Sequence, residues 1–354
     1  MEVEMKKLLL TAFAVIMFTG LVFAQAVAEA PKAPETKTQV FVDDLGREVV
    51  LPADITRIAP SGSNAQVIVF QVASDRLVGI ATKLSGQELD IYPEYTHDLP
   101  VLGTLYGKKA NLNKEALILC NPEVVIDVGD IKGSIEQMAK ELDQVSADVG
   151  VPVIFIEANM DNYPDVFRKL GKLLGEEERA EKLAQYYDDV VAQVCGHASN
   201  KMPRVYITSS NDGLNAIIAG KNHAQCAEKA GAEVVTTSKL VQSNGNVSLE
   251  TLYQLDPSYI FAYTEEGYKT ITTSGDWSTL TAVQNNRVYL VPYMPHGFID
   301  SPVCSNRIIG LYYLGSIFYP ELEIDIVAKT KEFYSLFYGK DLSDDMVRDI
   351  LHMN

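Results

Sequence analysis

The sequence of 354 residues predicts an α/β fold of two similar lobes joined by a single long α-helix. Three observations predict this architecture. Short β-rich runs alternate with helical patterns along the body of the chain, one helix-turn-strand pattern occurs twice, and one amphipathic stretch between the two halves is long enough to connect them. The chain is therefore expected to hold two domains and not one.

The predicted strands form two sets of four. They are residues 57–60, 76–81, 123–129 and 151–158 in the first half, and residues 204–210, 232–237, 258–264 and 287–292 in the second. Val, Ile, Tyr and Phe, which favour strands, are frequent in these runs. Helical patterns lie between them, for example at 63–73 and 133–150. Because strands that alternate with helices indicate parallel sheets, each lobe is predicted to be Rossmann-like.

An internal repeat strengthens the two-lobe prediction. Residues 112–126 (LNKEALILCNPEVVI) align without gaps on residues 247–261 (VSLETLYQLDPSYIF). In each copy a capping residue, Asn113 or Ser248, precedes a helix that ends at a proline and leads into an apolar strand. Two generic helix-strand units can match by chance over so short a length, but a duplicated lobe explains the match better.

The connecting helix is predicted from residues 178–196, where Leu183, Tyr186 and Val190 follow the apolar rhythm of one helix face. A helix over this stretch spans roughly 28 Å, comparable to a small domain. A surface helix of one lobe would show the same rhythm, so periodicity alone leaves both interpretations open. We expect a signal peptide at 1–26, a flexible leader at 27–38, an N-terminal lobe at 39–176, the interlobe helix at 177–199 and a C-terminal lobe at 200–354.

The N-terminus predicts export. Lys6 and Lys7 precede the apolar run 8–24, and small residues follow it, which is the pattern of a secretory signal peptide with cleavage near Ala26 or Ala28. A retained membrane anchor is the alternative. No cysteine follows the run to carry a lipid, so a free protein in the periplasm is expected.

Composition and motifs narrow the function. With 47 acidic against 30 basic side chains, the formal net charge of -17 opposes nucleic-acid binding. The sequence has no GxSxG, HExxH or Walker motif and no GxGxxG after a strand, so no enzyme is expected. The cysteines fit buried core positions better than disulfides, although four allow three pairings; they are Cys120, Cys195, Cys226 and Cys304.

Four strings then support a family resemblance: FVDDLGREVVLPADITRIA, LPVLGTLYGKKANLNKEALILCNPEVVI, DWSTLTAVQNNRVYLVP and DSPVCSNRIIGLYYLGSIFYP. In this order, and with the export signal, the chain from about Gln39 to Tyr338 resembles the solute-binding proteins of ABC importers, in the class that captures iron complexes, haem and corrinoids. The resemblance implies a ligand cleft between the lobes, a joining helix that limits hinge motion, and a membrane permease with its ATPase as partners. We expect a monomer with no resident cofactor. A periplasmic sensor or scaffold with the same fold is the alternative of another class.

The two glutamates of the repeat gain a role from this resemblance. In similar proteins one acidic residue on each lobe docks onto basic residues of the permease, and the matching positions are Glu115 and Glu250. The alternative is a first-turn glutamate that stabilises its own helix dipole.

Ligand-binding residues are predicted where strands end, since sites in open α/β units gather at the carboxyl ends of strands. The helix that follows the first strand also offers free amides to an anion. For each Ser or Asn, helix capping is the alternative. The candidates are Ser61, Ser63, Asn64, Lys83 and Tyr106 in the first lobe, and Ser209, Asn211, Tyr263, Tyr293 and His296 in the second.

A siderophore-like ferric complex is the ligand we expect first. Haem-binding members of the class place an axial Tyr near the loop of Tyr106, and His296 would supply a second ligand from the other lobe. Tyr106 would equally stack on a siderophore or a corrin. The sequence shows no cluster of Arg for a highly anionic siderophore, so haem, cobalamin or another corrinoid, and a molybdate-like oxyanion stay open.

Overall fold

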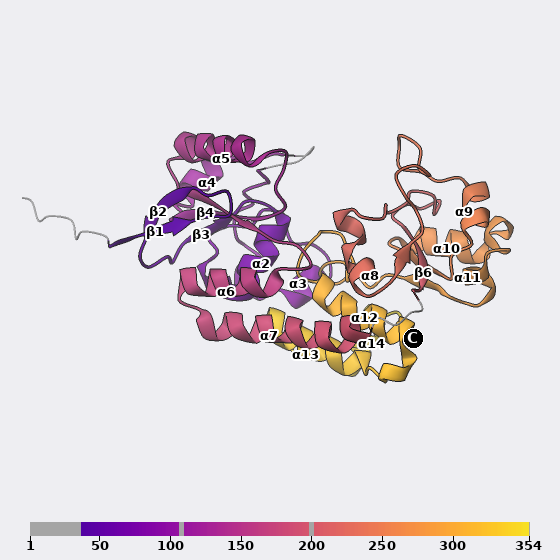
Figure 1. Cartoon of the computed structure of the whole chain (residues 1–354). Coiled ribbons are helices and arrows are strands. Elements are labelled where there is room, and N and C mark those ends of the chain that lie inside the picture. The colour runs from indigo at the N-terminus through magenta and orange to yellow at the C-terminus, as the bar shows by residue number, and fades with distance from the viewer. Residues whose placement is uncertain (1–36, 106–109, 198–201, 354) are drawn as a thin grey trace, which may run out of the picture. The chain divides into compact units, whose positions relative to one another are not determined.

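Two parallel sheets form the centres of the two lobes in the computed structural model, which describes residues 37–105, 110–197 and 202–353 (Figure 1). The first sheet has the order β3-β4-β5 and the second the order β7-β6-β8-β9, with every neighbouring pair parallel. The predicted α/β architecture with two lobes is therefore confirmed. The strands are β3 (Ile58–Pro60), β4 (Val124–Gly129), β5 (Val153–Glu157), β6 (Arg204–Thr208), β7 (Glu233–Val234), β8 (Tyr259–Ala262) and β9 (Val288–Leu290).

Some expectations fall outside the described residues. These are the signal peptide at 1–26, nearly all of the leader, and Tyr106 with the neighbouring lysines Lys108 and Lys109. Residues 38–354 form one compact unit.

The predicted strand at 76–81 is wrong. Its backbone makes only single bridges, from Leu77 to Ile58 and from Ile80 to Val101. The reason is that its hydrogen bonds alternate between two different neighbours: the Val78 N–H donates to the carbonyl of Ile58, and the Ile80 N–H to that of Pro100. A segment shared in this way forms no ladder with either neighbour.

A hairpin precedes the first sheet. β1 (Thr38–Val42) pairs antiparallel with β2 (Glu48–Pro52). Asp43, directly after β1, accepts hydrogen bonds from the Leu45 and Arg47 amides. Its carboxylate also forms an ion pair with the Arg47 guanidinium at 2.6 Å. This charged turn fixes the register of the hairpin.

The helices of the first lobe are α2 (Ser63–Ala73), α3 (Glu88–Ile91), α4 (Lys114–Leu119), α5 (Ile135–Val149) and α6 (Tyr163–Leu174). α2 is almost wholly apolar in sequence and is buried from Ala65 to Ala73, because it packs against β4, α6 and the C-terminal helix α13 (Ile326–Tyr338). Its N-terminus is thereby fixed at the carboxyl ends of β3 and β4.

The long joining helix is confirmed as α7 (Glu177–Val194), which is continued by one 3-10 turn at Cys195–His197. One face, which includes Leu183, Tyr186 and Val190, is buried against α6 and against α12 (Arg307–Phe318) and α13. The Tyr186 ring lies 5.9 Å from that of Tyr312 and 5.5 Å from that of Phe337. The joining helix therefore packs against α6, which precedes it in the sequence, and against α12 and α13, which follow it.

The second lobe holds α8 (Gln225–Lys229), α9 (Leu249–Leu255), α10 (Glu265–Thr273) and α11 (Thr281–Gln284), and the last helix of the chain is α14 (Asp344–Ile350). Single 3-10 turns lie at Ser74–Arg76, Glu94–Thr96, Asn222–Ala224, Gly275–Trp277 and Pro320–Leu322.

The repeat is confirmed as two equivalent structural units, α4 with β4 and α9 with β8. The Asn113 side chain accepts from the Ala116 N–H at 2.9 Å, and the Ser248 hydroxyl accepts from the Thr251 N–H at 3.1 Å. After each helix one residue has a positive φ, 47° at Asn121 and 37° at Asp256. The proline that follows turns the chain into the strand.

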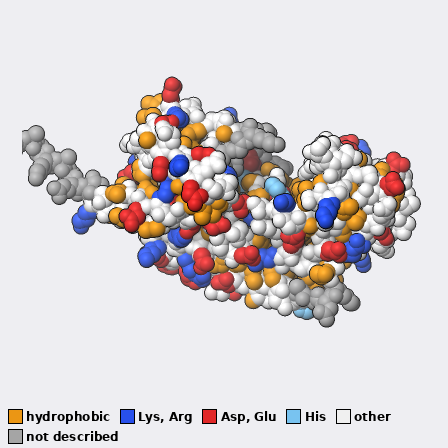
Figure 2. Space-filling model, turned by 45° about the horizontal axis from the view of Figure 1, so that its top comes forward, with side chains coloured by type: hydrophobic (Ala, Val, Ile, Leu, Met, Phe, Trp, Pro, Cys, Tyr) orange, Lys and Arg blue, Asp and Glu red, His pale blue; other side chains and the backbone are white. Residues whose placement is uncertain are grey.

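The cysteines are free thiols, as expected, and only Cys195 is not fully buried. On the face shown in Figure 2, acidic and basic side chains are interspersed. Within the described part of the chain, no helix is long and apolar enough to cross a membrane.

Candidate functional site

A cavity of about 250 Å³, here called the central cavity, brings together residues from both halves of the chain. Four of the predicted ligand-binding residues line it: Ser63 and Lys83 from the first lobe, and Tyr293 and His296 from the second. The remaining lining residues are Gln66, Thr82, Leu84, Glu88, Ser301 and Pro302. Four candidates nominated from separate positions in the sequence therefore line one cavity.

The N-terminus of α2 holds the first-lobe wall of the central cavity in place. The buried Gln66 side chain accepts hydrogen bonds from the backbone N–H groups of Ala81 at 2.8 Å and Thr82 at 3.1 Å. The Ser63 hydroxyl lies 2.9 Å from that of Thr82. These bonds fix the loop that carries Lys83. The exposed, positively charged Lys83 therefore lies at the edge of the cavity on a hydrogen-bonded loop.

His296 forms a neutral part of the opposite wall. Only 7% of its surface is exposed, and its Nε2 lies 2.9 Å from the Tyr92 hydroxyl. Burial lowers the pKa of His296 to about 4, and burial also raises the pKa of Tyr92. The Nε2 of His296 is therefore already hydrogen-bonded to Tyr92, and a metal could reach this imidazole only through Nδ1 unless that bond broke. The other residue proposed for haem ligation, Tyr106, lies outside the described residues.

A second cavity of about 170 Å³, here called the α2 cavity, adjoins the first through Ser63. It is lined by Ser61, Gly62, Ser63, Asn64, Ala65, Thr104, Asp127, Val128 and Lys132. The buried Ser61 hydroxyl donates to Oδ1 of Asp127, and the Asn64 amide donates to the Val128 carbonyl at 3.0 Å. Burial raises the pKa of the Asp127 carboxyl.

The helix-cap alternative is wrong at this position. Gly62 is the N-cap of α2, and no side chain caps the helix, because Ser61, Ser63 and Asn64 are hydrogen-bonded elsewhere. The first turn of α2 thus lines the α2 cavity, and no side chain caps its amides.

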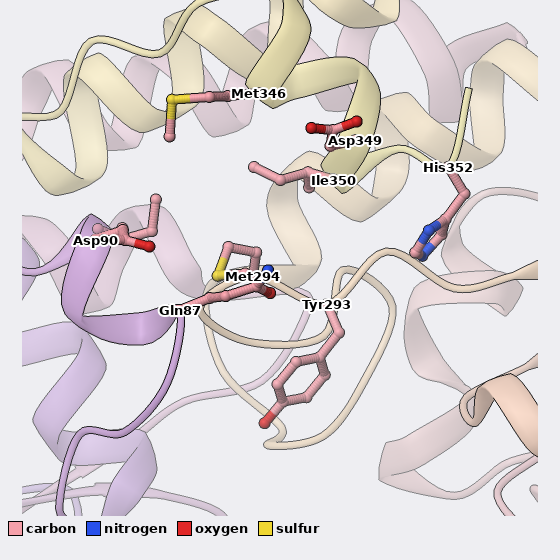
Figure 3. Close-up of a pocket in the computed structure, with 9 residues that line it drawn as sticks. Gln87, Asp90, Tyr293, Met294, Met346, Asp349, Ile350 and His352 are labelled. Carbon is pink, nitrogen blue, oxygen red and sulfur yellow. The ribbon is translucent and has the colours of Figure 1, made fainter. Parts of the chain in front are cut away.

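A third cavity of about 170 Å³ lies beyond Tyr293, between α3 and the C-terminal residues (Figure 3). Gln87, Asp90, Met294, Met346 and His352 are among its lining residues. The Tyr293 side chain points away from Met346 in this view, and Tyr293 also lines the central cavity.

The structure does not bring three of the predicted residues into the central or the α2 cavity. The Ser209 hydroxyl donates to Asn215 at 3.0 Å, and the Asn211 carbonyl accepts from Thr270. The Tyr263 hydroxyl is buried without a hydrogen-bond partner, near the carboxylate of Asp300. These residues follow strand ends of the second lobe, but none of them lines either cavity.

Sequence analysis missed a polar cluster at the junction of the lobes, centred on the fully buried Arg307. Its guanidinium donates to the Tyr163 hydroxyl at 3.1 Å and to the Asn222 carbonyl at 3.0 Å. The Asn222 amide in turn donates to Asp130 at 2.6 Å. The sequence signal for this cluster was an arginine at the start of an otherwise apolar helix, RIIGLYYLGSIF.

His223 lies beside this cluster and forms an ion pair with the buried Asp300 at 2.7 Å. The hydrogen bond to Asp300 raises the pKa of His223, and burial opposes the shift. Asp130 faces the same imidazole, and burial raises the pKa of its own carboxyl.

Glu115 and Glu250 occupy equivalent first-turn positions in α4 and α9, and both side chains are exposed. This geometry agrees with docking to a partner and with stabilisation of the helix dipole alike. Both interpretations therefore stay open on structural grounds.

Two α/β lobes, a single joining helix and a cavity lined from both lobes define the class of two-lobed solute-binding proteins. The family model described as "Periplasmic binding protein" matches residues 61–293, and the chain belongs to this family.

Relatives agree with the family. An uncharacterized ABC transporter substrate-binding lipoprotein, YvrC of Bacillus subtilis, is 22% identical over 280 residues, which are 72% of this chain and 79% of that protein. The solved structure of an ABC transporter solute binding protein from Sulfurospirillum deleyianum is 28% identical, with a TM-score of 0.79, and the match covers 88% of this chain and 99% of that one.

The molybdate-bound protein MolA of Haemophilus influenzae shares the fold at 18% identity and a TM-score of 0.63, over 86% of this chain and 99% of that one. This level of identity shows the fold alone. The Bacillus relative is a lipoprotein by description, whereas the first cysteine of this sequence is Cys120.

Proposed function

We propose that this chain is the solute-capturing subunit of an ABC importer, and that it binds its solute in the central cavity and delivers it to a membrane permease with its ATPase. The observation that carries this proposal is the cavity itself, since residues from both halves of a member of the periplasmic binding protein family line one space. Ligands of such proteins are held where two lobes meet, so that binding and closure are linked.

A siderophore-like ferric complex is our first candidate for the solute, on the strength of the sequence resemblance. An oxyanion is the second, and a specific observation favours it. The two adjoining cavities measure about 250 and 170 Å³, and even together they lie near the low end of the 300 to 1,000 Å³ typical of sites for drug-sized ligands. Space of this size suits a small solute better than haem or a corrinoid.

The location and assembly state are part of the same proposal. The signal peptide predicted at 1–26 would place the mature chain in the periplasm as a free monomer. Persistence of the mature protein in washed membranes would contradict this.

The ligand is identified by purifying the protein from its native cells and recording its visible absorption spectrum, its metal content and its native mass. A charge-transfer band with bound iron supports a ferric siderophore, a Soret band supports haem, and corrin bands support a cobalamin relative. A colourless protein with a small anion supports the second candidate. A protein that never carries a solute and is dispensable for uptake would favour a sensor or scaffold.

Docking is tested by charge reversal. We expect Glu115→Lys combined with Glu250→Lys to abolish uptake of the identified solute and to leave its affinity unchanged, since both side chains lie outside the described cavities. Glu136→Lys is the matched control, because Glu136 is an exposed first-turn glutamate of α5 outside the repeat. Loss of affinity in the double variant would refute docking as the role of these residues.

A further inference from the structure

The α2 cavity contains an unpaired carboxylate oxygen. Asp127 is only 3% exposed, and while its Oδ1 accepts from Ser61, its Oδ2 has no hydrogen-bond partner. The side-chain oxygen of Asn64 is also buried without a partner in the same cavity. Buried acceptors without a donor are rare in folded proteins, and leaving one unpaired is costly. This cavity therefore calls for a group that donates hydrogen bonds.

The same cavity also favours negative charge. The N-terminus of α2, an eleven-residue helix without a side-chain cap, contributes the partial positive charge of its dipole, and its first residues Ser63, Asn64 and Ala65 line the cavity. Lys132 lines the cavity as well and acts electrostatically on Asp127. Amide donors and a cation at one end suit the oxygens of an anion.

An anion that still carries a proton can satisfy the donors and the acceptors of this small cavity together. We propose that the α2 cavity is a subsite for a hydrogen-bearing oxyanion of the phosphate type, whose O–H donates to Oδ2 of Asp127 while its other oxygens accept from the first-turn amides of α2. A fully deprotonated oxyanion such as sulfate has no proton to place between its oxygens and the carboxylate, so the two would repel. The inference rests on the proposed capture function, and it assigns the chemistry of one part of the solute.

The phosphoryl group has two possible sources, free phosphate or the end of a larger solute that continues past Ser63 into the central cavity. The purified full-length mature chain is titrated by calorimetry at pH 6 with inorganic phosphate, glycerol phosphate and sulfate. At this pH about half of a phosphate monoester still carries its second proton. We expect phosphate or glycerol phosphate to bind at least tenfold more tightly than sulfate. Preference for phosphate identifies the free ion, and preference for glycerol phosphate identifies the larger solute.

Asp127→Asn tests the carboxylate alone and leaves the other lining residues unchanged. The amide that replaces the carboxylate can donate a hydrogen bond to any oxyanion, protonated or not. We expect it to lose the preference over sulfate. Asp300→Asn is the matched control, because Asp300 is also 3% exposed with one unpaired oxygen but does not line the α2 cavity. It is expected to keep the preference.

Equal binding of sulfate and phosphate to the wild type overturns the inference, because it shows that the carboxyl is itself protonated and acts as a donor. An unchanged preference in Asp127→Asn overturns it as well. If none of the three anions binds, the subsite is refuted. If the native mass of the same protein shows a different bound solute, the capture function still stands. The wild-type comparison holds even where a variant does not fold.

Discussion

Replacing Arg307 by methionine tests whether the junction of the lobes depends on one buried guanidinium. The side chain is fully buried and donates four hydrogen bonds, to the Tyr163 hydroxyl, to the carbonyls of Asn222 and Cys304, and to the side chain of Gln225. These acceptors come from α6, from the segment that opens α8, and from the loop before α12. Methionine keeps much of the apolar stem but removes every donor.

The expected loss follows from what the substitution leaves behind. Well-packed hydrophobic groups can replace a buried ion at no cost when its partners are replaced too, but here all four acceptors stay and lose their donor. Truncating one side of such a buried network costs about 3 to 5 kcal/mol. With a urea m-value of about 3 kcal/mol/M, the unfolding midpoint falls by roughly 1 to 1.7 M.

Equilibrium unfolding in urea, followed by fluorescence and by circular dichroism, measures this midpoint. Arg307→Lys keeps the charge without the planar fork and is expected to lie between wild type and Arg307→Met. Arg287→Met is the surface control: Arg287 is exposed and contacts only the Tyr259 ring, at 5.0 Å, so we expect a change below about 1 kcal/mol. A midpoint for Arg307→Met at or above that of wild type would refute the reasoning.

Two other substitutions test particular contacts. Gly310→Ala places a Cβ 2.0 Å from the Phe298 carbonyl oxygen, so it should destabilise the fold by about 1 to 3 kcal/mol or more in thermal unfolding, whereas Gly275→Ala, which meets nothing within 4 Å, should change little. His223→Gln removes the ion pair with Asp300, which raises the folded-state pKa of His223. The contribution of this pair to the free energy of unfolding is fully present below about pH 6.5 and is lost as pH rises through the folded-state pKa. The difference in unfolding free energy from wild type should be greater at pH 5.5 than at pH 8.5 and stay below about 1 kcal/mol, because the side chain is 58% exposed; a difference that grows with pH would contradict this assignment.

Much of the fold is predictable because it depends on local patterns. The β-rich runs, the caps at Asn113 and Ser248 and the apolar face of α7 each depend on a few neighbouring residues, and the structure confirms all of them except the strand predicted at 76–81. The segment 76–81 has strand composition but divides its hydrogen bonds between two neighbours. Which neighbours a strand meets is a property of the tertiary structure, and composition does not encode it.

The site was predictable only in part, for a related reason. The strand-end rule nominated Ser63 and His296, which both line the central cavity, but it does not state which way a side chain turns. Ser209 satisfies the same rule and turns to Asn215 instead. Arg307 was missed because its meaning depends on Tyr163, which is 144 positions away in the sequence.

The neutral imidazole of His296 has a consequence for how a solute leaves. With a pKa of about 4, this residue keeps the same charge across every pH at which a bacterium grows well, and so does its partner Tyr92. Acidification therefore gives this wall no electrostatic means of expelling cargo. If the central cavity holds the solute as proposed, release would depend on separating Tyr293, His296, Ser301 and Pro302 from the first-lobe residues that line the same cavity.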